Sequence, residues 1–281
     1  MDYGDYHKTF AEYIRAKKLF FDGLPKGAFA LTNADDRNGR VMVQNTAAAV
    51  SAYSLRAMAD FRCKIVEMHL DGMLLRIDGQ ELWVGLLGRF NAYNLLAVYG
   101  AASLLGLNRG EVLRVLSMLH AVSGRFEKIR AANGTTAIVD YAHTPDALEN
   151  VIQTIEEIRT PGQQLIVVCG CGGDRDRPTR PEMAALAVKY APPAVFTSDN
   201  PRHESPEAIL DDMVAGLEPG ARYLRIADRA EAIRTAVMLS RPGDIILVAG
   251  KGHETYQIVG DVKHPFDGRE EIKKRFALLI Y

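Results

Sequence analysis

Four polar turns in the second half of the chain carry side chains that could bind a charged ligand. Each turn follows a short apolar run that is typical of a buried strand, so each begins where a strand would end. Because the carboxyl ends of parallel strands meet at one edge of an open α/β sheet, we expect these turns to lie close together. They are formed by residues 140–143, 170–176, 199–202 and 250–254.

The side chains in these turns are chemically complementary to a zwitterion. Arg175 and Arg202 carry planar guanidinium groups, which bind carboxylates through paired hydrogen bonds. Asp199, Asn200 and Glu254 can accept hydrogen bonds from ammonium groups. The combination predicts a site for an amino acid with more than one charged end. Glycines that would permit a close approach of the backbone stand at positions 172, 173, 250 and 252.

Each turn also has an ordinary interpretation when it is taken alone. A glycine-rich turn after a strand is often only a tight connection to the next helix, and a loop arginine is often a solvated charge. Residues 250–252 lack the G-x-x-x-x-G-K-[ST] spacing of a phosphate loop, and Arg175 stands where G-x-G-x-x-G needs its last glycine. His143 and His253 are, taken singly, more often structural or surface side chains. The functional interpretation therefore depends on the turns meeting at one edge.

The second half of the chain alternates between apolar strands and amphipathic helices. Proline at the first helical position marks helix starts after Thr144 and Ser205, and Asp228 and Glu231 have the spacing of a capping box. This alternation indicates an α/β fold with a doubly wound, mostly parallel sheet that is covered on both faces. Strands are predicted at residues 136–140, 165–169, 194–197, 223–226 and 244–249, with a closing hairpin around Gly260.

Residues 1–122 have a different pattern, and we place a domain boundary between them and residues 123–281. A helix is expected within residues 1–24, followed by a strand and then a second helix that runs into Ala49. The next segment predicts a small β-sheet of short strands, with Asp78 and Gly79 as a hairpin turn. Two helices end this part of the chain. The first of them has a predicted apolar stripe of Phe90, Tyr93, Leu96, Ala97, Gly100 and Leu104.

The composition of the 281 residues is that of an ordinary globular protein. The formal net charge of −1 argues against a nucleic-acid-binding protein that works through a basic surface. No apolar run is long enough to span a bilayer and no signal peptide is visible, so we expect no membrane insertion. The three cysteines have no histidine cluster beside them, which favours free thiols over zinc ligands. We expect a cytoplasmic protein.

Four motifs occur in a fixed order: DYAHTP from Asp140, GCGGDRD from Gly170, DNPR from Asp199 and GKGHE from Gly250. Together they resemble the motifs of the Mur ligase family. The resemblance implies a Rossmann-like C-terminal domain, preceded by the C-terminal part of a central ATP-binding domain. In that family, DNPR is typical of the members that add meso-2,6-diaminopimelate. By resemblance, the arginines would hold its carboxylates and Glu254 an amino group, within a set of Arg175, Asp199, Asn200, Pro201, Arg202, Gly250 and Glu254.

The resemblance also implies a reaction and its cofactors. Mur ligases use ATP to phosphorylate a carboxylate, here that of D-glutamate in UDP-MurNAc-L-Ala-D-Glu. The amine of diaminopimelate would then attack the acyl phosphate, and Mg²⁺ would bridge the phosphates in the intact enzyme. Asn91 and Asn94 match family contacts to ATP, and helix capping is the alternative role for both. The full set of predicted ATP contacts is Asn91, Asn94, Arg125, Asp140 and His143.

The sequence also departs from the family pattern. It contains no G-x-x-x-x-G-K-[ST] motif and no counterpart of the carbamylated lysine, the upstream metal-binding carboxylate or the UDP-substrate domain. We therefore expect a fragment of a longer ligase, with no ligase or ATPase activity by itself, no assigned catalytic residue and no metal ligands. Two other interpretations stay open: a lysine-adding member of the family, and a binding module that has lost catalysis.

Overall fold

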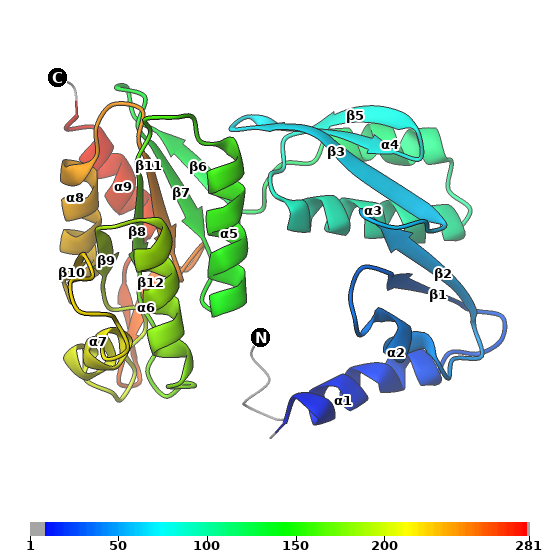
Figure 1. The fold of residues 1–281 in the computed structure, drawn as a ribbon, viewed down its shortest axis with the longest axis horizontal. Helices are drawn as coiled ribbons and strands as arrows, with labels where there is room; N and C mark the ends of the chain where they lie inside the picture. Colours follow the sequence, from blue (N-terminus) through cyan, green and yellow to red (C-terminus); the bar gives the residue numbers. More distant parts are fainter. Residues whose placement is uncertain (1–8, 280–281) are drawn as a thin grey trace. The chain divides into compact units, whose positions relative to one another are not determined.

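Each half of the chain packs around its own buried apolar side chains. The computed structural model describes residues 9–279. The chain divides into unit 1, residues 1–120, and unit 2, residues 121–281 (Figure 1).

Unit 1 is built on a five-stranded sheet with the order β1-β2-β3-β4-β5. The first three strands are parallel, and β3, β4 and β5 form an antiparallel meander. Helix α3 packs against β1, β2 and β3, and α4 packs against β5. The elements are α1 Phe10–Asp22, β1 Phe29–Asn33, α2 Gly39–Val43, β2 Ala49–Ser54, β3 Phe61–His69, β4 Gly72–Ile77, β5 Gln80–Val84, α3 Arg89–Leu104 and α4 Arg109–Ser117.

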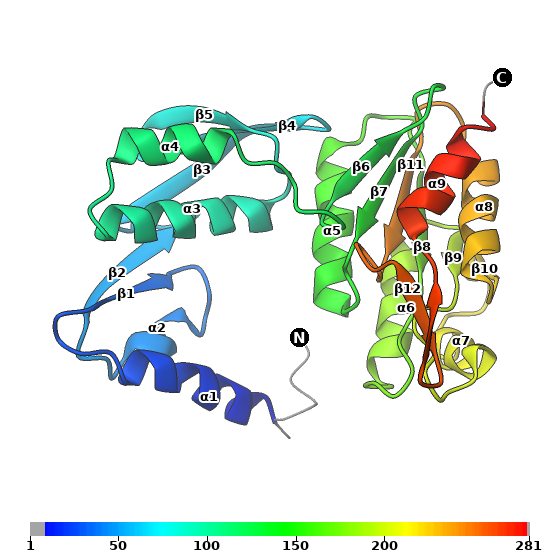
Figure 2. The ribbon, with the colours of Figure 1, turned by 180° about the vertical axis from the view of Figure 1, so that it is seen from behind.

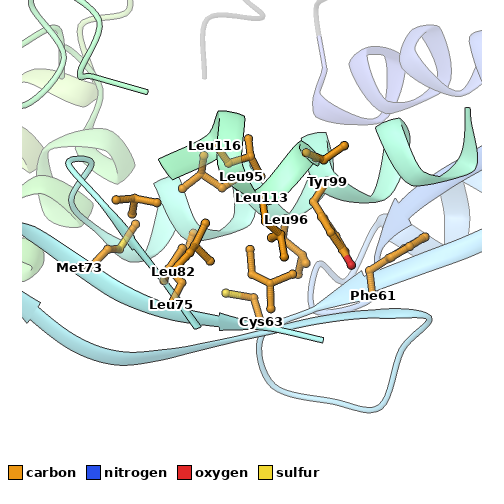
Figure 3. Close-up of a cluster of buried hydrophobic side chains, with 14 residues drawn as sticks. Phe61, Cys63, Met73, Leu75, Leu82, Leu95, Leu96, Tyr99, Leu113 and Leu116 are labelled. Carbon is orange, nitrogen blue, oxygen red and sulfur yellow. The ribbon is translucent and has the colours of Figure 1, made fainter. Parts of the chain in front are cut away.

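The predicted hairpin and the core of unit 1 are both present. Asp78 and Gly79 form the two-residue turn between β4 and β5, and their φ values of 46° and 87° are those that such a turn requires. Side chains from the meander and from α3 and α4 pack into one cluster, drawn in Figure 3. Its labelled members are Phe61, Cys63, Met73, Leu75, Leu82, Leu95, Leu96, Tyr99, Leu113 and Leu116.

Two details of unit 1 differ from the expectation. The predicted helix into Ala49 is wrong, because α2 ends at Val43 and Ala49 begins β2. The Ala49 N–H donates to Ala28 O, so strand pairing decides its conformation. The buried stripe of α3 is also rotated from the predicted one. Tyr93, which was predicted to belong to it, is only partly buried, and its hydroxyl donates to Asp35. The buried residues of α3 are Ala92, Leu95, Leu96, Tyr99 and Gly100.

Unit 2 contains a six-stranded sheet with the order β10-β9-β8-β11-β7-β6. All neighbouring strands are parallel except the edge strand β6, which runs antiparallel to β7. The doubly wound, mostly parallel sheet is thus confirmed, whereas β6 and α9 were not predicted. The elements are β6 Glu127–Arg130, β7 Thr136–Asp140, α5 Pro145–Ile158, β8 Leu165–Cys169, α6 Thr179–Tyr190, β9 Ala194–Phe196, α7 Pro206–Val214, β10 Tyr223–Arg225, α8 Arg229–Leu239, β11 Ile245–Ala249, β12 Tyr256–Val259, β13 Val262–Pro265 and α9 Gly268–Phe276.

Helices cover both faces of the unit 2 sheet, as Figures 1 and 2 show. Helices α8 and α9 lie on one face, and α5 and α6 lie on the other. Along β7, Ala137 and Val139 belong to the core under α8 and α9, while Ile138 between them is fully buried on the opposite side. A strand that is covered on both faces is apolar at every position, which explains the unbroken apolar runs of the sequence.

Of the helices formed by residues 9–279, none combines the length and the hydrophobicity of a bilayer-spanning segment. Cys63, Cys169 and Cys171 are free and buried. Burial raises the pKa of the Cys169 thiol to about 12, so this side chain is an apolar filler and not a reactive thiolate.

Candidate functional site

The strand order of unit 2 brings the four polar turns together. Strands β9, β8, β11 and β7 are consecutive neighbours, and each is followed by one of the turns. Gly250 N donates to Asp140 O over 3.0 Å, which joins the turns after β11 and β7. Gly170 lies so close to Thr197 O that a Cβ on it would collide with that oxygen, which joins the turns after β8 and β9. The predicted convergence at one sheet edge is present.

Asp199 is a buried carboxylate against which only a glycine fits. Gly250 has φ of 113°, and an added Cβ would collide with Asp199 Oδ2. The fully buried Arg229 lies close to this carboxylate, with Nη1 3.8 Å from Oδ2. Its guanidinium donates its hydrogen bonds to Ser198 O and Ala249 O instead. Within residues 9–279, Asp199 Oδ2 has no hydrogen-bond partner. A buried acceptor of this kind is suited to a donor from a ligand.

Asn200, Lys251 and Glu254 form a closed triangle of hydrogen bonds. Lys251 Nζ donates to Asn200 Oδ1 and to Glu254 Oε2, each over 2.8 Å, and Asn200 Nδ2 donates to the same Oε2 over 3.0 Å. Burial opposes ionisation of Glu254, but the hydrogen bonds from Lys251 and Asn200 outweigh it and hold its pKa below the ordinary value. Glu254 is therefore an anion at neutral pH.

The two arginines predicted to bind carboxylates both lie close to Gly172. A Cβ on Gly172 would stand 3.0 Å from Arg202 Nη1 and 3.4 Å from Arg175 Cγ. Arg175 is exposed, whereas Arg202 is partly buried and Nη1 donates to Gly173 O over 2.8 Å. The Arg202 guanidinium and the stem of the Arg175 side chain thus meet at one glycine, and this arrangement favours the binding of an anionic ligand group there.

The backbone of Arg202 is fixed by the hairpin of β12 and β13. Arg202 N donates to Ile258 O over 3.1 Å, and Gly260 N donates to Arg202 O over 2.7 Å. Its φ of 49° lies in the left-handed region, which costs free energy for a residue other than glycine. Pro201, which is buried, has its carbonyl against Gly173, where a Cβ would collide with it. These contacts aim the Arg202 side chain at the glycine-rich turn.

A second group of predicted residues surrounds the ring of Tyr141. The guanidinium of Arg125 lies 4.9 Å from the ring centroid, and the His143 and His253 rings lie 4.8 and 5.6 Å from it. The Asp140 carboxylate accepts from Phe126 N and Ala142 N over 2.7 and 2.8 Å, yet burial dominates and raises its pKa. Asp140 thus fixes the backbone of Phe126 and Ala142, the residues that follow Arg125 and Tyr141. In this group, the guanidinium of the exposed Arg125 is the charged group that could bind a phosphate.

Asn91 and Asn94 belong to unit 1 and lie in the first turns of α3. Asn91 Nδ2 donates to Leu87 O over 2.7 Å, which is a local contact at the start of the helix. Asn94 is exposed, and its Nδ2 lies 3.5 Å from Asn91 Oδ1. Gly88 is the N-cap of α3, and no side chain among the described residues caps this helix end, so Asn91 does not have the capping role that the sequence left open. The contact of Asn91 and Asn94 with ATP stays a prediction.

No group of three or more His, Cys, Asp or Glu side chains within residues 9–279 is arranged to hold a metal ion. The carboxylates of the site are bound to Lys251 or to backbone amides, or lie beside Arg229, so the residues present do not fit a resident Mg²⁺.

Several residues of the site were not found from the sequence. Lys251 was set aside with the unsuccessful phosphate-loop match, although a lysine between two glycines in a strand-end turn was the available signal. Arg229 stands in the first turn of α8, far along the chain from the motifs, and no spacing pointed to it. Arg180 was also missed: its guanidinium is 1% exposed and binds Glu204 beside the site.

Comparisons with known proteins relate both units to one group of enzymes. Residues 2–102 match the family model described as Mur ligase middle domain, and residues 124–252 match the one described as Mur ligase, glutamate ligase domain. UDP-N-acetylmuramoyl-L-alanyl-D-glutamate–2,6-diaminopimelate ligase of Phocaeicola vulgatus is 56% identical over 278 residues, which are 98% of this chain and 57% of that protein. The ligase of the same name from Parabacteroides distasonis gives the same identity and shares.

A solved structure described as UDP-N-acetylmuramoyl-L-alanyl-D-glutamate–2,6-diaminopimelate ligase is also similar. It has a TM-score of 0.63 and 36% sequence identity, and the match covers 98% of this chain and 58% of that chain. The chain thus spans a little over half the length of the relatives it matches.

Proposed function

This chain belongs to the Mur ligase family, and on that premise we propose that it carries the amino-acid site of an ATP-dependent ligase. The ligase joins meso-2,6-diaminopimelate to UDP-MurNAc-L-Ala-D-Glu in peptidoglycan precursor synthesis, a cytoplasmic step. The free cysteines are consistent with that compartment.

The observation that carries this proposal is the pairing of opposite charges at one sheet edge. Arg175 and Arg202 both lie close to Gly172, and Asp199 and Glu254 lie in the adjoining turns. Diaminopimelate has an ammonium and a carboxylate at each end, so the arginines would bind carboxylate and the acidic side chains would bind ammonium. The chain's own residues would hold and orient the incoming amine. Asn200, Pro201 and Gly250 shape the turns that carry these charges.

We assign ATP binding to the group around Tyr141, with Arg125 as the contact to phosphate and with Asp140 and His143 beside it. For Asn91 and Asn94, on α3 of unit 1, contact with ATP is a separate proposal that rests on the family resemblance. A polypeptide of these 281 residues has no phosphate-loop motif, and we propose that it does not turn over ATP by itself. Measured ATP hydrolysis in the presence of both substrates would refute this part of the proposal.

Titration calorimetry of the chain with meso-diaminopimelate and with L-lysine tests the amino-acid site. We expect diaminopimelate to bind more tightly, and Arg202→Ala to weaken its binding by about 2 kcal/mol, the scale of a charge-assisted hydrogen bond. The exposed Arg234, which pairs with Glu231 on α8, provides the control: Arg234→Ala should leave the affinity unchanged. Tighter binding of L-lysine would support the lysine-adding alternative, and binding of neither would support a module without this function.

A further inference from the structure

Lys251 is a buried charge that the proposed ligand contacts do not use. Its side chain is 3% exposed, and a lysine is rarely so buried unless it is paired. Nζ lies 2.8 Å from Asn200 Oδ1, 2.8 Å from Glu254 Oε2 and 5.7 Å from the centroid of the Tyr256 ring. The ammonium thus stands directly behind the carboxylate that is proposed to bind the ligand's amino group.

The contacts of Asn200 show how Lys251 orients this carboxylate. Asn200 Oδ1 accepts from Ile258 N over 2.9 Å as well as from Lys251, so two donors fix the orientation of the amide. Asn200 Nδ2 consequently faces Glu254, and its hydrogen bond ends on Oε2, as the one from Lys251 does. Among the residues that the structure describes, Oε1 is the oxygen left to a ligand.

Each acidic side chain in this part of the site is accompanied by a buried cation. Arg229 Nη1 lies 3.8 Å from Asp199 Oδ2 and Lys251 Nζ lies 2.8 Å from Glu254 Oε2, so two positive charges balance the two negative ones. Meso-diaminopimelate differs from L-lysine by one carboxylate on the distal carbon. Its distal end is therefore neutral overall, whereas the distal end of L-lysine is a bare cation. A site whose negative charges are already balanced favours the neutral group over the bare cation.

We propose that Lys251 is a specificity-determining residue that acts through Glu254. Its ammonium keeps Glu254 ionised and fixes the orientation of the carboxylate. The same ammonium offsets the negative charge of Glu254, so that a ligand group with an ammonium alone binds weakly. The residue selects an ammonium accompanied by a carboxylate. This inference rests on the proposed function, since it concerns the choice between two ligands of the same site.

The test is the ratio of the dissociation constants of L-lysine and meso-diaminopimelate, measured by calorimetry on the chain and its variants. Lys251→Gln keeps a hydrogen-bond donor but removes the charge, and it should lower the ratio about tenfold, the effect of one charge-assisted contact. Lys251→Arg keeps the charge and should keep the ratio of the unaltered chain. Asn200→Asp places a negative charge against Lys251 and should lower the ratio as Lys251→Gln does, which provides a second test if the glutamine variant does not fold.

The outcomes separate this inference from the proposed function. If the unaltered chain prefers diaminopimelate but the ratio stays the same in the folded Lys251→Gln and Asn200→Asp variants, the role of Lys251 is wrong and the proposed function stands. If the unaltered chain binds both ligands equally or neither, the proposed function fails and this inference fails with it.

Discussion

The Arg180 guanidinium binds both carboxylate oxygens of Glu204, with Nη2 2.8 Å from Oε1 and Nη1 3.0 Å from Oε2. The same arginine donates to Gly172 O over 3.2 Å, and Glu204 Oε1 accepts from Asp174 N over 2.6 Å. This pair therefore ties the glycine-rich turn after β8 to the turn after β9, which carries Arg202. Neither side chain is among the proposed ligand contacts, but both position the turns that carry these contacts.

Replacing Arg180 by methionine should destabilise unit 2 by about 3 kcal/mol, because the change leaves Glu204 without its buried partner. The chain has a single tryptophan, Trp83 on β5 of unit 1, so its fluorescence reports on the other unit. Hydrogen exchange in peptides from β8 and β9 should accelerate in the variant while the unfolding transition of Trp83 stays in place.

Arg177 provides the matched control for this change. It also contacts Glu204, at 3.3 Å, but its side chain is 69% exposed. An exposed pair contributes little, so Arg177→Met should cost no more than about 0.5 kcal/mol. Equal losses of stability in the Arg177→Met and Arg180→Met variants would show that burial does not determine how much the Arg180–Glu204 pair stabilises unit 2.

The Arg180–Glu204 pair also predicts an acid-sensitive step in the stability of unit 2. The hydrogen bond from Arg180, helped by Asp174 N, lowers the pKa of Glu204 to about 2 from an ordinary 4.5. The unfolded chain binds the proton more readily, so the stabilisation is complete above pH 4.5 and is lost as the pH falls towards 2. Urea unfolding between about pH 5 and about pH 3 should show a fall in stability that is smaller in Glu204→Gln.

Much of unit 2 followed from the sequence because local signals agreed with the tertiary structure. Continuous apolar strands, Pro145 and Pro206 at helix starts, and Asp228 as an N-cap each specify their element locally. The edge strand β6 gave no such signal, because it is only half-buried and depends on pairing with β7. In unit 1, pairing with β1 likewise determines the conformation of Ala49, and the local sequence does not.

The site was predictable where its residues stand in the turns themselves. Arg175 and Arg202 were expected to converge, and the strand order brings both side chains close to Gly172. The supporting charges were not predictable, because Arg180 and Arg229 reach the site from helices and are recognised only by what they contact. A sequence pattern readily indicates the groups that bind a ligand. It indicates less readily the groups that hold these ligand-binding groups in place.

Gly250→Ala should weaken diaminopimelate binding about tenfold or more, because the new Cβ would collide with Asp199 Oδ2 and displace this carboxylate. Alanine is also strained at the φ of 113°. Gly220 has a φ of 91° with nothing within 4 Å of an added Cβ, so Gly220→Ala carries the backbone strain without the collision. Calorimetry should show weakened binding for the first variant alone. Equal affinities of the two variants for diaminopimelate would show that the close approach of Gly250 to Asp199 is not needed for binding.

In unit 1, Asp35 joins three separate segments through one carboxylate. It accepts from Ser54 Oγ over 2.6 Å, from Leu55 N over 2.8 Å and from the hydroxyl of Tyr93 on α3 over 2.8 Å. Burial works against its charge, but these hydrogen bonds prevail and lower the pKa of Asp35. Burial, with the hydrogen bond to Asp35, raises the pKa of Tyr93 to about 12. The carboxylate thereby fixes the first turns of α3, which carry Asn91.

Asp35→Asn should destabilise unit 1 by about 2 kcal/mol, since an amide N–H₂ would face donors where a carboxylate oxygen accepts now. Trp83 fluorescence during urea unfolding measures this change directly. The neighbouring Asp36 is exposed and accepts from Asn38 N through one oxygen, so Asp36→Asn keeps an acceptor and should leave the stability nearly unchanged.

Because the pKa of Asp35 is lowered in the folded chain, the stabilisation by its carboxylate is present at neutral pH and disappears in acid. The difference between the Asp35→Asn variant and the unaltered chain should therefore shrink as the pH falls below the ordinary value of 3.8. A difference that is independent of pH would show that the charge of Asp35 contributes nothing.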